Sequence, residues 1–164
     1  MKEIQTTHNT ENVACDEYYT PIEFVNALGH FDTDPCVPLN MKNKTAYLMY
    51  NKNDDGLSKE WVGRVWLNPP YSAELIKSFM AKMALHGNGI ALVLPKFGTR
   101  LFRESVYPYA DGIYVLRHRI KFFNEDWVQQ KSPIASSVLI AYGKENVDAI
   151  LNSGIEGTML YLKH

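Results

Sequence analysis

The chain has 164 residues, of which 46% are hydrophobic and 21% are charged, and this size and composition predict one soluble globular domain rather than a disordered or multidomain protein. Its formal net charge of -1 excludes a surface coated in positive charge, although a local basic face is enough to bind a polyanion. The two cysteines and five scattered histidines are too few for a disulfide framework or a four-ligand metal site, so we expect no metal ion and a reducing, intracellular setting.

The start of the chain shows no targeting signal. The polar sequence MKEIQTTHNTEN lacks the apolar stretch of a signal peptide, and no apolar run approaches the roughly 20 residues that cross a bilayer. We therefore expect a cytoplasmic protein without membrane contact. Residues 1–14 show no apolar period and are predicted to form a flexible tail, which leaves residues 15–164 as a single domain.

The first half of the folded region is predicted to begin with a helix. Thr20 can cap this helix, Pro21 suits its first position and Glu23 completes a capping box, while Gly29 ends it. The elements predicted next are a short strand that ends at Asp34, a strand over 45–50 followed by a turn, a strand over 64–67, and a helix over 72–86 with Leu75, Ile76, Phe79, Met80, Met83 and Ala84 on one face.

The second half continues the alternation of strands and helices. Residues 89–95 form a continuous apolar run, which is typical of a central strand buried on both faces. After it we predict a helix over 99–107, strands over 112–116 and 134–142, a helix over 144–152 and a last strand over 158–162. This alternation predicts an α/β sandwich with a mostly parallel sheet, an antiparallel edge near the end and helices on both faces. Ligands of such sheets bind beyond the carboxyl ends of the strands.

The tetrapeptide Asn68-Pro69-Pro70-Tyr71 follows directly after the strand at 64–67. The prolines stiffen the chain, so that the carbonyl of Pro69 cannot enter a helix or a ladder, and Asn68 offers a second oxygen acceptor at the same strand end. Two fixed acceptors can bind both hydrogens of an aromatic amine and favour the pyramidal nitrogen that attacks a methyl group. Tyr71 can stack on the ring that carries the amine. The alternative interpretation is a rigid loop in which Asn68 bonds the local backbone.

Several motifs accompany this tetrapeptide. In chain order they are Tyr19-Thr20-Pro21, Asp34-Pro35-Cys36, Asp54-Asp55-Gly56-Leu57 followed by Trp61, Asn68-Pro69-Pro70-Tyr71, Leu92-Val93-Leu94-Pro95, Arg119-Ile120-Lys121-Phe122 and Ser132-Pro133. Their joint occurrence and order, from about Tyr18 to Tyr142, resemble the phage-type Dam-like DNA adenine methyltransferases. The resemblance implies a Rossmann-like class I methyltransferase fold, S-adenosylmethionine as methyl donor, adenine in DNA as acceptor, and the cytoplasm of a bacterial host as location.

The resemblance also implies roles for individual residues. The expected catalytic set is Asn68, Pro69, Pro70 and Tyr71. On the cofactor, Thr20 and Pro21 would border the methionine end, Asp34 would lie beside the ammonium or ribose, and Asp54 or Asp55 would meet the adenine amine or the ribose hydroxyls. Pro35 is also expected among the cofactor-binding residues. The alternatives are that Thr20 only caps its helix, that Asp34 caps the following turn, and that 54–56 is a plain turn.

Substrate contacts are expected from an aromatic pair and a basic segment. A duplex adenine must be extruded before transfer, and stacking of ~1 to 3 kcal/mol per base offsets part of that cost. By the same resemblance, Phe122 and Phe123 stand where related enzymes offer a ring opposite the tyrosine; they alternate across a strand, so at most one faces the base and the other is core. The residues expected on the DNA backbone are Lys96, Arg100, Arg103, Arg117, Arg119 and Lys121, against only Glu104 and Asp111 in that segment, unless this is merely a solvated face.

The loop after the first predicted strand departs from the related enzymes. Many methyltransferases carry a glycine-rich loop there, whereas residues 34–40 contain no glycine, so the roles of Cys36 and Asn40 stay open. Two other functions also stay open: methylation of a protein glutamine amide, because the tetrapeptide suits any planar amine, and a non-catalytic nucleic-acid-binding module. The recognition sequence and the oligomeric state, including a homodimer, are not determined; specificity would come from loops such as 36–44 and 117–133.

Overall fold

The structure is a computed structural model that describes residues 18–131 and 136–163. Seven strands of these residues form one sheet in the order β2-β1-β3-β4-β6-β5-β7. The predicted tail at 1–14 and the motif Ser132-Pro133 lie outside the described residues. None of the described helices is long and apolar enough to cross a membrane.

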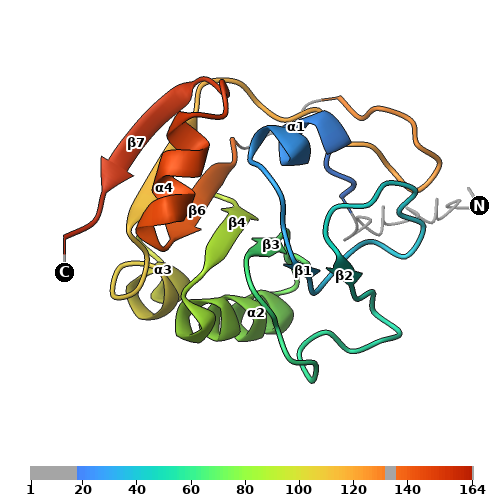
Figure 1. The fold of residues 1–164 in the computed structure, drawn as a ribbon, viewed down its shortest axis with the longest axis horizontal. Coiled ribbons are helices and arrows are strands. Elements are labelled where there is room, and N and C mark those ends of the chain that lie inside the picture. The colour runs from blue at the N-terminus through green and yellow to red at the C-terminus, as the bar shows by residue number, and fades with distance from the viewer. Residues whose placement is uncertain (1–17, 132–135, 164) are drawn as a thin grey trace, which may run out of the picture.

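The elements follow the predicted order (Figure 1). The strands are β1 (Thr33–Asp34), β2 (Leu48–Met49), β3 (Val65–Leu67), β4 (Gly89–Val93), β5 (Gly112–Leu116), β6 (Val138–Tyr142) and β7 (Gly157–Tyr161), and the helices are α1 (Ile22–Ala27), α2 (Ala73–His86), α3 (Arg100–Ser105) and α4 (Lys144–Leu151). The predicted α/β class is confirmed. The strand predicted over 45–50 is reduced to two residues, which pair with β1 at the edge of the sheet.

Five strands run in one direction and two run against them. The pairs β1·β2, β1·β3 and β3·β4 are parallel, whereas β6 is antiparallel to both β4 and β5, and β7 is antiparallel to β5. Strands β1 to β5 therefore share one direction, as the prediction of a mostly parallel sheet requires. The antiparallel strands are not confined to one edge as predicted, since β6 lies inside the sheet between β4 and β5.

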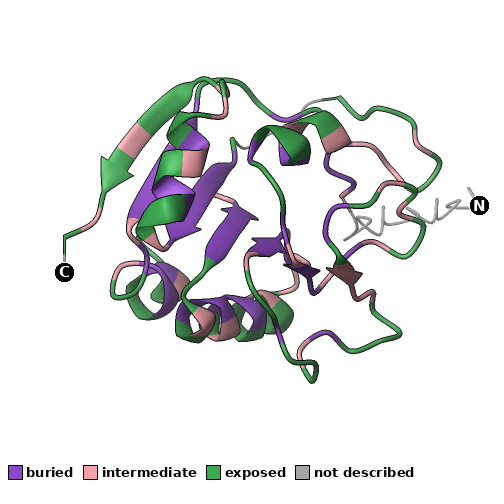
Figure 2. Cartoon of the chain, in the orientation of Figure 1, coloured by how far each residue is buried: buried purple, intermediate pink, exposed green. Residues whose placement is uncertain are grey.

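Two layers of helix cover the two faces of the sheet. On one face, α2 and α3 pack with side chains such as Val65, Leu67 and Val93. On the other face, α1 and α4 pack with the alternate side chains, among them Trp66 and Leu92. Figure 2 shows that the central strands β3, β4 and β6 are buried along their length. Burial on both faces explains why these strands are continuous apolar runs rather than alternating ones.

Helix α2 follows the predicted apolar period with one exception. Phe79, Met80, Met83 and Ala84 are buried, and Gly87 ends the helix in the left-handed region with φ 72°, where its N–H donates to the carbonyl of Met83. Leu75 was predicted on the same buried face but is 45% exposed. It lies in the first turn of the helix, at the wall of a cavity, and this position explains an exposed leucine.

The predicted capping box at the start of α1 is wrong. Pro21 occupies the N-cap position, and the helix has no side-chain cap. The hydroxyl of Thr20 is instead 3.2 Å from the side-chain amide of Asn68, and Thr20 is buried. A long-range hydrogen bond thus takes the place of the local one that the sequence pattern favoured.

The shared strand direction determines where a site can form. Because β1, β3, β4 and β5 run the same way, the segments that follow them emerge at one edge of the sheet. These segments begin at Pro35, Asn68, Leu94 and Arg117. The tetrapeptide after β3 and both ends of the basic stretch are therefore brought to the same edge, which is the one where α/β sheets bind ligands.

Candidate active site

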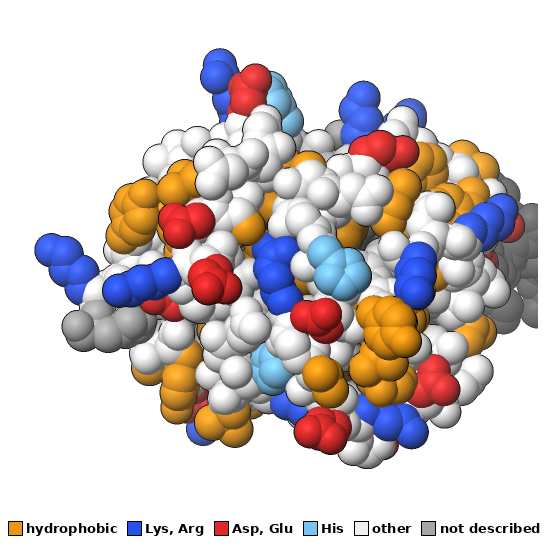
Figure 3. All heavy atoms as spheres, in the orientation of Figure 1, with side chains coloured by type: hydrophobic (Ala, Val, Ile, Leu, Met, Phe, Trp, Pro, Cys, Tyr) orange, Lys and Arg blue, Asp and Glu red, His pale blue; other side chains and the backbone are white. Residues whose placement is uncertain are grey.

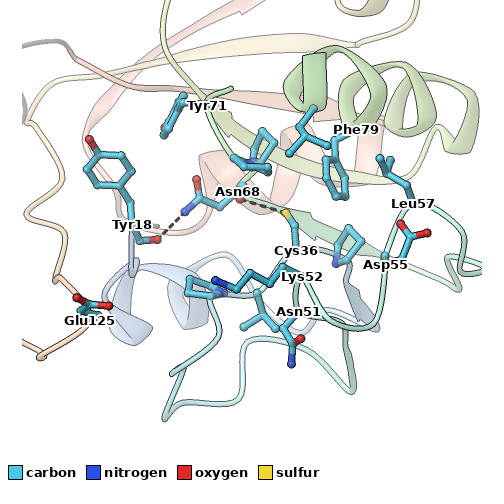
Figure 4. Close-up of a pocket in the computed structure, with 17 residues that line it drawn as sticks. Tyr18, Cys36, Asn51, Lys52, Asp55, Leu57, Asn68, Tyr71, Phe79 and Glu125 are labelled. Atoms are coloured by element: carbon cyan, nitrogen blue, oxygen red, sulfur yellow. Dashed lines mark hydrogen bonds between the residues drawn. The ribbon is translucent and has the colours of Figure 1, made fainter. Parts of the chain in front are cut away.

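A cavity of about 500 Å³ opens at the carboxyl edge of the sheet. It is lined by segments 35–38, 51–52, 55–57 and 68–71, together with Tyr18, Leu75, Phe79 and Glu125 (Figure 4). The wall near Leu57 and Phe79 is apolar, whereas Asn68 and Asp55 bring oxygen atoms to it. A volume of this size lies within the roughly 300–1,000 Å³ of small-molecule sites.

The side-chain amide of Asn68 is held in one orientation. Its nitrogen donates to the carbonyl of Tyr18 at 3.0 Å and to the hydroxyl of Thr20 at 3.2 Å. Since a carbonyl oxygen can only accept, the nitrogen rather than the oxygen must face Tyr18. The amide oxygen Oδ1 is then turned away from that carbonyl, on the side of Tyr71 (Figure 4), and it is buried with no hydrogen-bond partner among the described residues.

An unpaired buried oxygen is costly, so its presence indicates a ligand group that donates to it. A buried polar group without a partner costs about 1–3 kcal/mol. The nitrogen donates to two acceptors, and because the carbonyl of Tyr18 can only accept, Asn68 cannot relieve this cost by rotation of the amide. The alternative interpretation, in which Asn68 only bonds the local backbone, accounts for the nitrogen but leaves the oxygen unexplained.

Cys36 joins the loop after β1 to the tetrapeptide. Its thiol donates to the backbone carbonyl of Asn68 at 3.1 Å. Burial raises the pKa of the Cys36 thiol well above its ordinary value, and the nearby carboxylate of Asp34 raises it further. The thiol therefore remains protonated and keeps donating, which gives Cys36 a positioning role in the wall of the cavity.

The ring of Tyr71, in the tetrapeptide, begins a series of aromatic contacts that continues through Tyr18 to Phe122. The ring centroid of Tyr18 is 5.5 Å from that of Tyr71 and 5.5 Å from that of Phe122, both in edge-on contacts. Burial raises the pKa of Tyr71 far above its ordinary value, so its phenol is neutral at physiological pH and is not a base. Phe122 is 2% exposed and belongs to the core, whereas Phe123 packs against Trp127.

The loop before β3 lies directly on the loop after β1. A Cβ at Gly56 would overlap the carbonyl oxygen of Pro35, so only glycine permits this approach of the two backbones. The indole of Trp61 donates to the carbonyl of Gly56 at 2.8 Å, and its ring stacks on Phe79 at 6.2 Å. Lys82 holds the next carbonyl, that of Leu57, at 2.8 Å. These contacts explain the spacing of the motif Asp54-Asp55-Gly56-Leu57 and the following Trp61.

The carboxylates expected at the cofactor occupy different environments. Asp55 lines the cavity, whereas Asp54 accepts from the backbone N–H of Asn51 at 2.9 Å in an exposed turn. Asp34 is 3% exposed and accepts from the hydroxyl of Thr45 at 2.5 Å and from the N–H of Cys36 at 3.2 Å. Burial raises the pKa of Asp34 to about 6, against the opposing effect of these two donors.

The structure brings part of the predicted site together. Among the described residues, the cavity walls include the whole tetrapeptide, Pro35 and Asp55, but not Thr20, Pro21, Asp34, Asp54, Phe122 or Phe123. Thr20 and Asp34 lie just beneath the wall, around a much smaller cavity. The sequence alone gives no role to Tyr18 and leaves that of Cys36 open, although Tyr18 adjoins a motif and Cys36 belongs to one. It also does not predict Phe79 and Leu75 in the cavity wall, because their helical period indicates the core.

The basic stretch is partly neutralised on the surface. Arg100 pairs with Glu104 at 2.6 Å, and Arg117 pairs with Glu156 at 3.3 Å. Glu156 lies next to β7, outside the segment in which charges were counted, so the sequence overestimated the local excess. Figure 3 shows basic and acidic side chains interspersed over one face of the molecule. Exposed pairs of this kind contribute little energy, so phosphates can compete for these arginines.

With this geometry established, comparison with known proteins identifies the family. The family model described as DNA N-6-adenine-methyltransferase (Dam) matches residues 5–151. The chain belongs to this family. A DNA N-6-adenine-methyltransferase of Escherichia phage T1 is 32% identical to it over 117 residues, which are 65% of this chain and 48% of the relative.

The match confirms the Dam-like resemblance carried by the ordered motifs. The chain spans about half the length of the curated relative it matches. No solved structure matches the chain.

Substitution of Gly56 tests the close approach of the two loops. Gly56→Ala should lower the free energy of unfolding by about 2–3 kcal/mol, because the methyl group would force the backbone away from Pro35. Gly98→Ala is the matched control: a Cβ there meets nothing within 4 Å, so the change should stay within about 0.5 kcal/mol. Urea unfolding of both variants measures the difference, and equal stabilities would refute the contact.

Asp34 should give the chain a distinctive pH dependence. Its pKa rises from 3.8 to about 6 on folding, so the folded state binds this proton more tightly than the unfolded state. The resulting stabilisation is complete below about pH 4 and is lost as the pH rises through 6. Relative to Asp34→Asn, which does not titrate, the wild-type chain should lose about 2 kcal/mol of stability from pH 4 to pH 7. Parallel pH profiles in urea unfolding would contradict this.

Proposed function

We propose that the chain transfers a methyl group from S-adenosylmethionine to the exocyclic amine of adenine in DNA. The observation that carries the proposal is the buried Oδ1 of Asn68, which has no hydrogen-bond partner among the described residues and is held in place by two acceptors that bind the nitrogen of the same amide. It lies at the strand end where the motif Asn68-Pro69-Pro70-Tyr71 begins. Family membership supports the same reaction.

The residues around the cavity fit the methyl donor. Leu57, Phe79 and Pro35 offer apolar surface to the adenine of the cofactor, and the carboxylate of Asp55 can accept from its amine or ribose hydroxyls. The roles predicted for Thr20, Asp34 and Asp54 are weaker, because their side chains do not line this cavity. When bound, S-adenosylmethionine supplies an activated methyl group on a sulfonium centre.

The acceptor amine would be held by the tetrapeptide. A hydrogen bond from the acceptor amine to Oδ1 of Asn68 would remove the energetic cost of the unpaired oxygen. The same hydrogen bond would fix the position of the acceptor nitrogen. Hydrogen bonds from both amine hydrogens, to Asn68 and to the carbonyl of Pro69, favour a pyramidal nitrogen with an available lone pair. No base is needed beforehand, which agrees with a Tyr71 phenol that stays neutral. Water removes the extra proton afterwards.

The target adenine must leave the duplex to reach this position. Tyr71 and Tyr18 are the aromatic side chains that line the cavity beside Asn68, and they provide surface on which a flipped base can stack. Phe122 supports the ring of Tyr18 from the core, so its predicted contact with the base becomes an indirect one. Transfer of tritium from labelled cofactor to DNA, with protein as the alternative acceptor, tests the proposal directly; no transfer and no cofactor binding would favour the non-catalytic module.

Asn68→Ala should abolish methyl transfer while cofactor affinity stays within about threefold of wild type. The reason is that Oδ1 acts on the acceptor amine in the transition state and not on the cofactor. Single-turnover transfer to DNA and calorimetric titration with S-adenosylmethionine measure the two effects. More than a tenth of wild-type turnover in this variant would refute the assignment of Asn68.

Asn68→Asp should retain more activity than Asn68→Ala, in a pH-dependent way. The carboxyl keeps one oxygen toward the acceptor but places the other near the carbonyl of Tyr18, which accepts at 3.0 Å in the wild type. Only a protonated carboxyl can donate there. Activity relative to wild type should therefore rise as the pH falls from 8 to 6, and a ratio independent of pH would contradict the orientation derived for the amide.

Salt dependence of DNA binding tests the basic stretch. Each lost phosphate contact should reduce the slope of log affinity against log salt by about 0.9. Removal of the charges of Arg100, Arg103, Arg117 and Arg119 should therefore weaken binding to all sequences and flatten the slope. Glu104→Gln is the opposite control, because it releases Arg100 from its ion pair and should strengthen binding. A wild-type slope in the arginine variant would place DNA elsewhere.

A further inference from the structure

The two hydrogens of the Asn68 amide are bound by one short segment, about 50 residues earlier in the chain. Tyr18 provides a backbone carbonyl and Thr20 provides a hydroxyl. Both acceptors come from the stretch that leads into α1, and both bind the nitrogen of the amide rather than its oxygen. The orientation of the proposed catalytic side chain is therefore set from outside its own strand.

This segment is itself held in place by backbone pairing. The N–H of Tyr19 donates to the carbonyl of Phe123 at 3.1 Å, and the N–H of Phe123 donates to the carbonyl of Tyr19 at 3.0 Å. The phenol of Tyr19 accepts from the N–H of Asn40 at 3.3 Å, and Tyr19 is fully buried. The residues on either side of Tyr19 thus present their oxygens to Asn68 from a fixed position.

Among the described residues, the hydroxyl of Thr20 serves neither as a helix cap nor as part of the cavity wall. It does not cap α1, and Thr20 is 3% exposed and does not line the cavity. In the described part of the chain, this hydroxyl accepts a hydrogen bond from the side-chain nitrogen of Asn68. Of the two acceptors it is the one supplied by a side chain, so it is the one that substitution can remove.

We infer that Thr20 is a positioning residue, which fixes the Asn68 amide so that Oδ1 faces the acceptor amine. The expected effect on kcat rests on the proposed function, whereas the hydrogen bond between Thr20 and Asn68 does not depend on it. If the amide rotated, its hydrogens would point at the acceptor amine and its oxygen would face the carbonyl of Tyr18, two acceptors in contact. The carbonyl of Tyr18 excludes this state, and the hydroxyl of Thr20 binds the second amide hydrogen, which would otherwise be buried and unpaired.

Thr20→Val tests the inference, because valine keeps the shape of threonine and loses the acceptor. We expect kcat for DNA methylation to fall about tenfold or more, with KM for S-adenosylmethionine within about twofold of wild type. Thr20→Ser keeps the hydroxyl and should retain kcat within about threefold. A raised KM with unchanged kcat would mean that Thr20 contacts the cofactor directly and would overturn the inference, as would equal kcat in the valine and wild-type proteins.

Thr33→Val is the matched control for loss of a buried hydroxyl. Thr33 is fully buried in β1, its hydroxyl donates to the carbonyl of Val62 at 2.8 Å, and it lies outside the cavity wall. This variant should lose stability like Thr20→Val but keep kcat per folded molecule. If both variants lost kcat equally, the effect would be one of general destabilisation and the inference would fail.

A second readout does not depend on methyl transfer. With asparagine labelled by ¹⁵N in the full chain, the side-chain NH₂ of Asn68 is identified as the resonance pair that disappears in Asn68→Ala. Its hydrogen exchange should be slow in wild type and Thr20→Ser and at least tenfold faster in Thr20→Val. Unchanged exchange in Thr20→Val would refute the contact. If wild type transferred no methyl group to DNA while this pattern held, the proposed function alone would fail.

Discussion

One buried amide organises the candidate site. Asn68 stands at the end of a fully buried strand, where its nitrogen is bound by the segment before α1 and its carbonyl by the thiol of Cys36. Three parts of the chain that are distant in sequence therefore meet at one residue. The result is an oxygen beside a cavity that has no partner in the part of the chain that the structure describes, and such an oxygen is stabilised when a donor binds to it. The segment before α1 and the loop after β1 hold Asn68 in the position that leaves this oxygen free to accept a hydrogen bond.

The cavity wall depends on a glycine in the loop after β2, whereas many methyltransferases have their glycines in the loop after the first strand. The loop after β1 contains no glycine, which left the cofactor site in doubt at the level of sequence. In the structure, Gly56 from the following loop lies against the carbonyl of Pro35, and Trp61 and Lys82 hold the carbonyls of Gly56 and Leu57. Close approach of two backbones requires a residue without a Cβ on only one of them. The short loop can therefore form a wall without glycines of its own.

Electrostatics favours neutral groups at the centre of the site and charged ones at its margin. The phenol of Tyr71 and the thiol of Cys36 both have pKa values raised by burial, so neither carries charge near neutral pH. Asp55 lies in the cavity wall near an exposed turn, and Arg100 and Arg117 of the basic stretch lie on the surface in ion pairs with Glu104 and Glu156. This arrangement suits a reaction that proceeds by placement of an amine rather than by prior removal of its proton.

The sequence by itself determined the α/β class, the order of the elements, the position of the tetrapeptide after a buried strand and the family, because apolar periods and turn residues are local signals and the ordered motifs are specific together. It did not determine that β6 lies between β4 and β5, that Leu75 faces a cavity, or that Phe122 is core. It also favoured a helix cap for Thr20, since local spacing cannot show a competing partner 48 residues away. Only the tertiary structure decided that Thr20 binds Asn68 rather than its own helix. The direction of the strands brings the segments after β1 and β3 to one edge of the sheet, and a polar group that is buried there must find its hydrogen-bond partners among its neighbours.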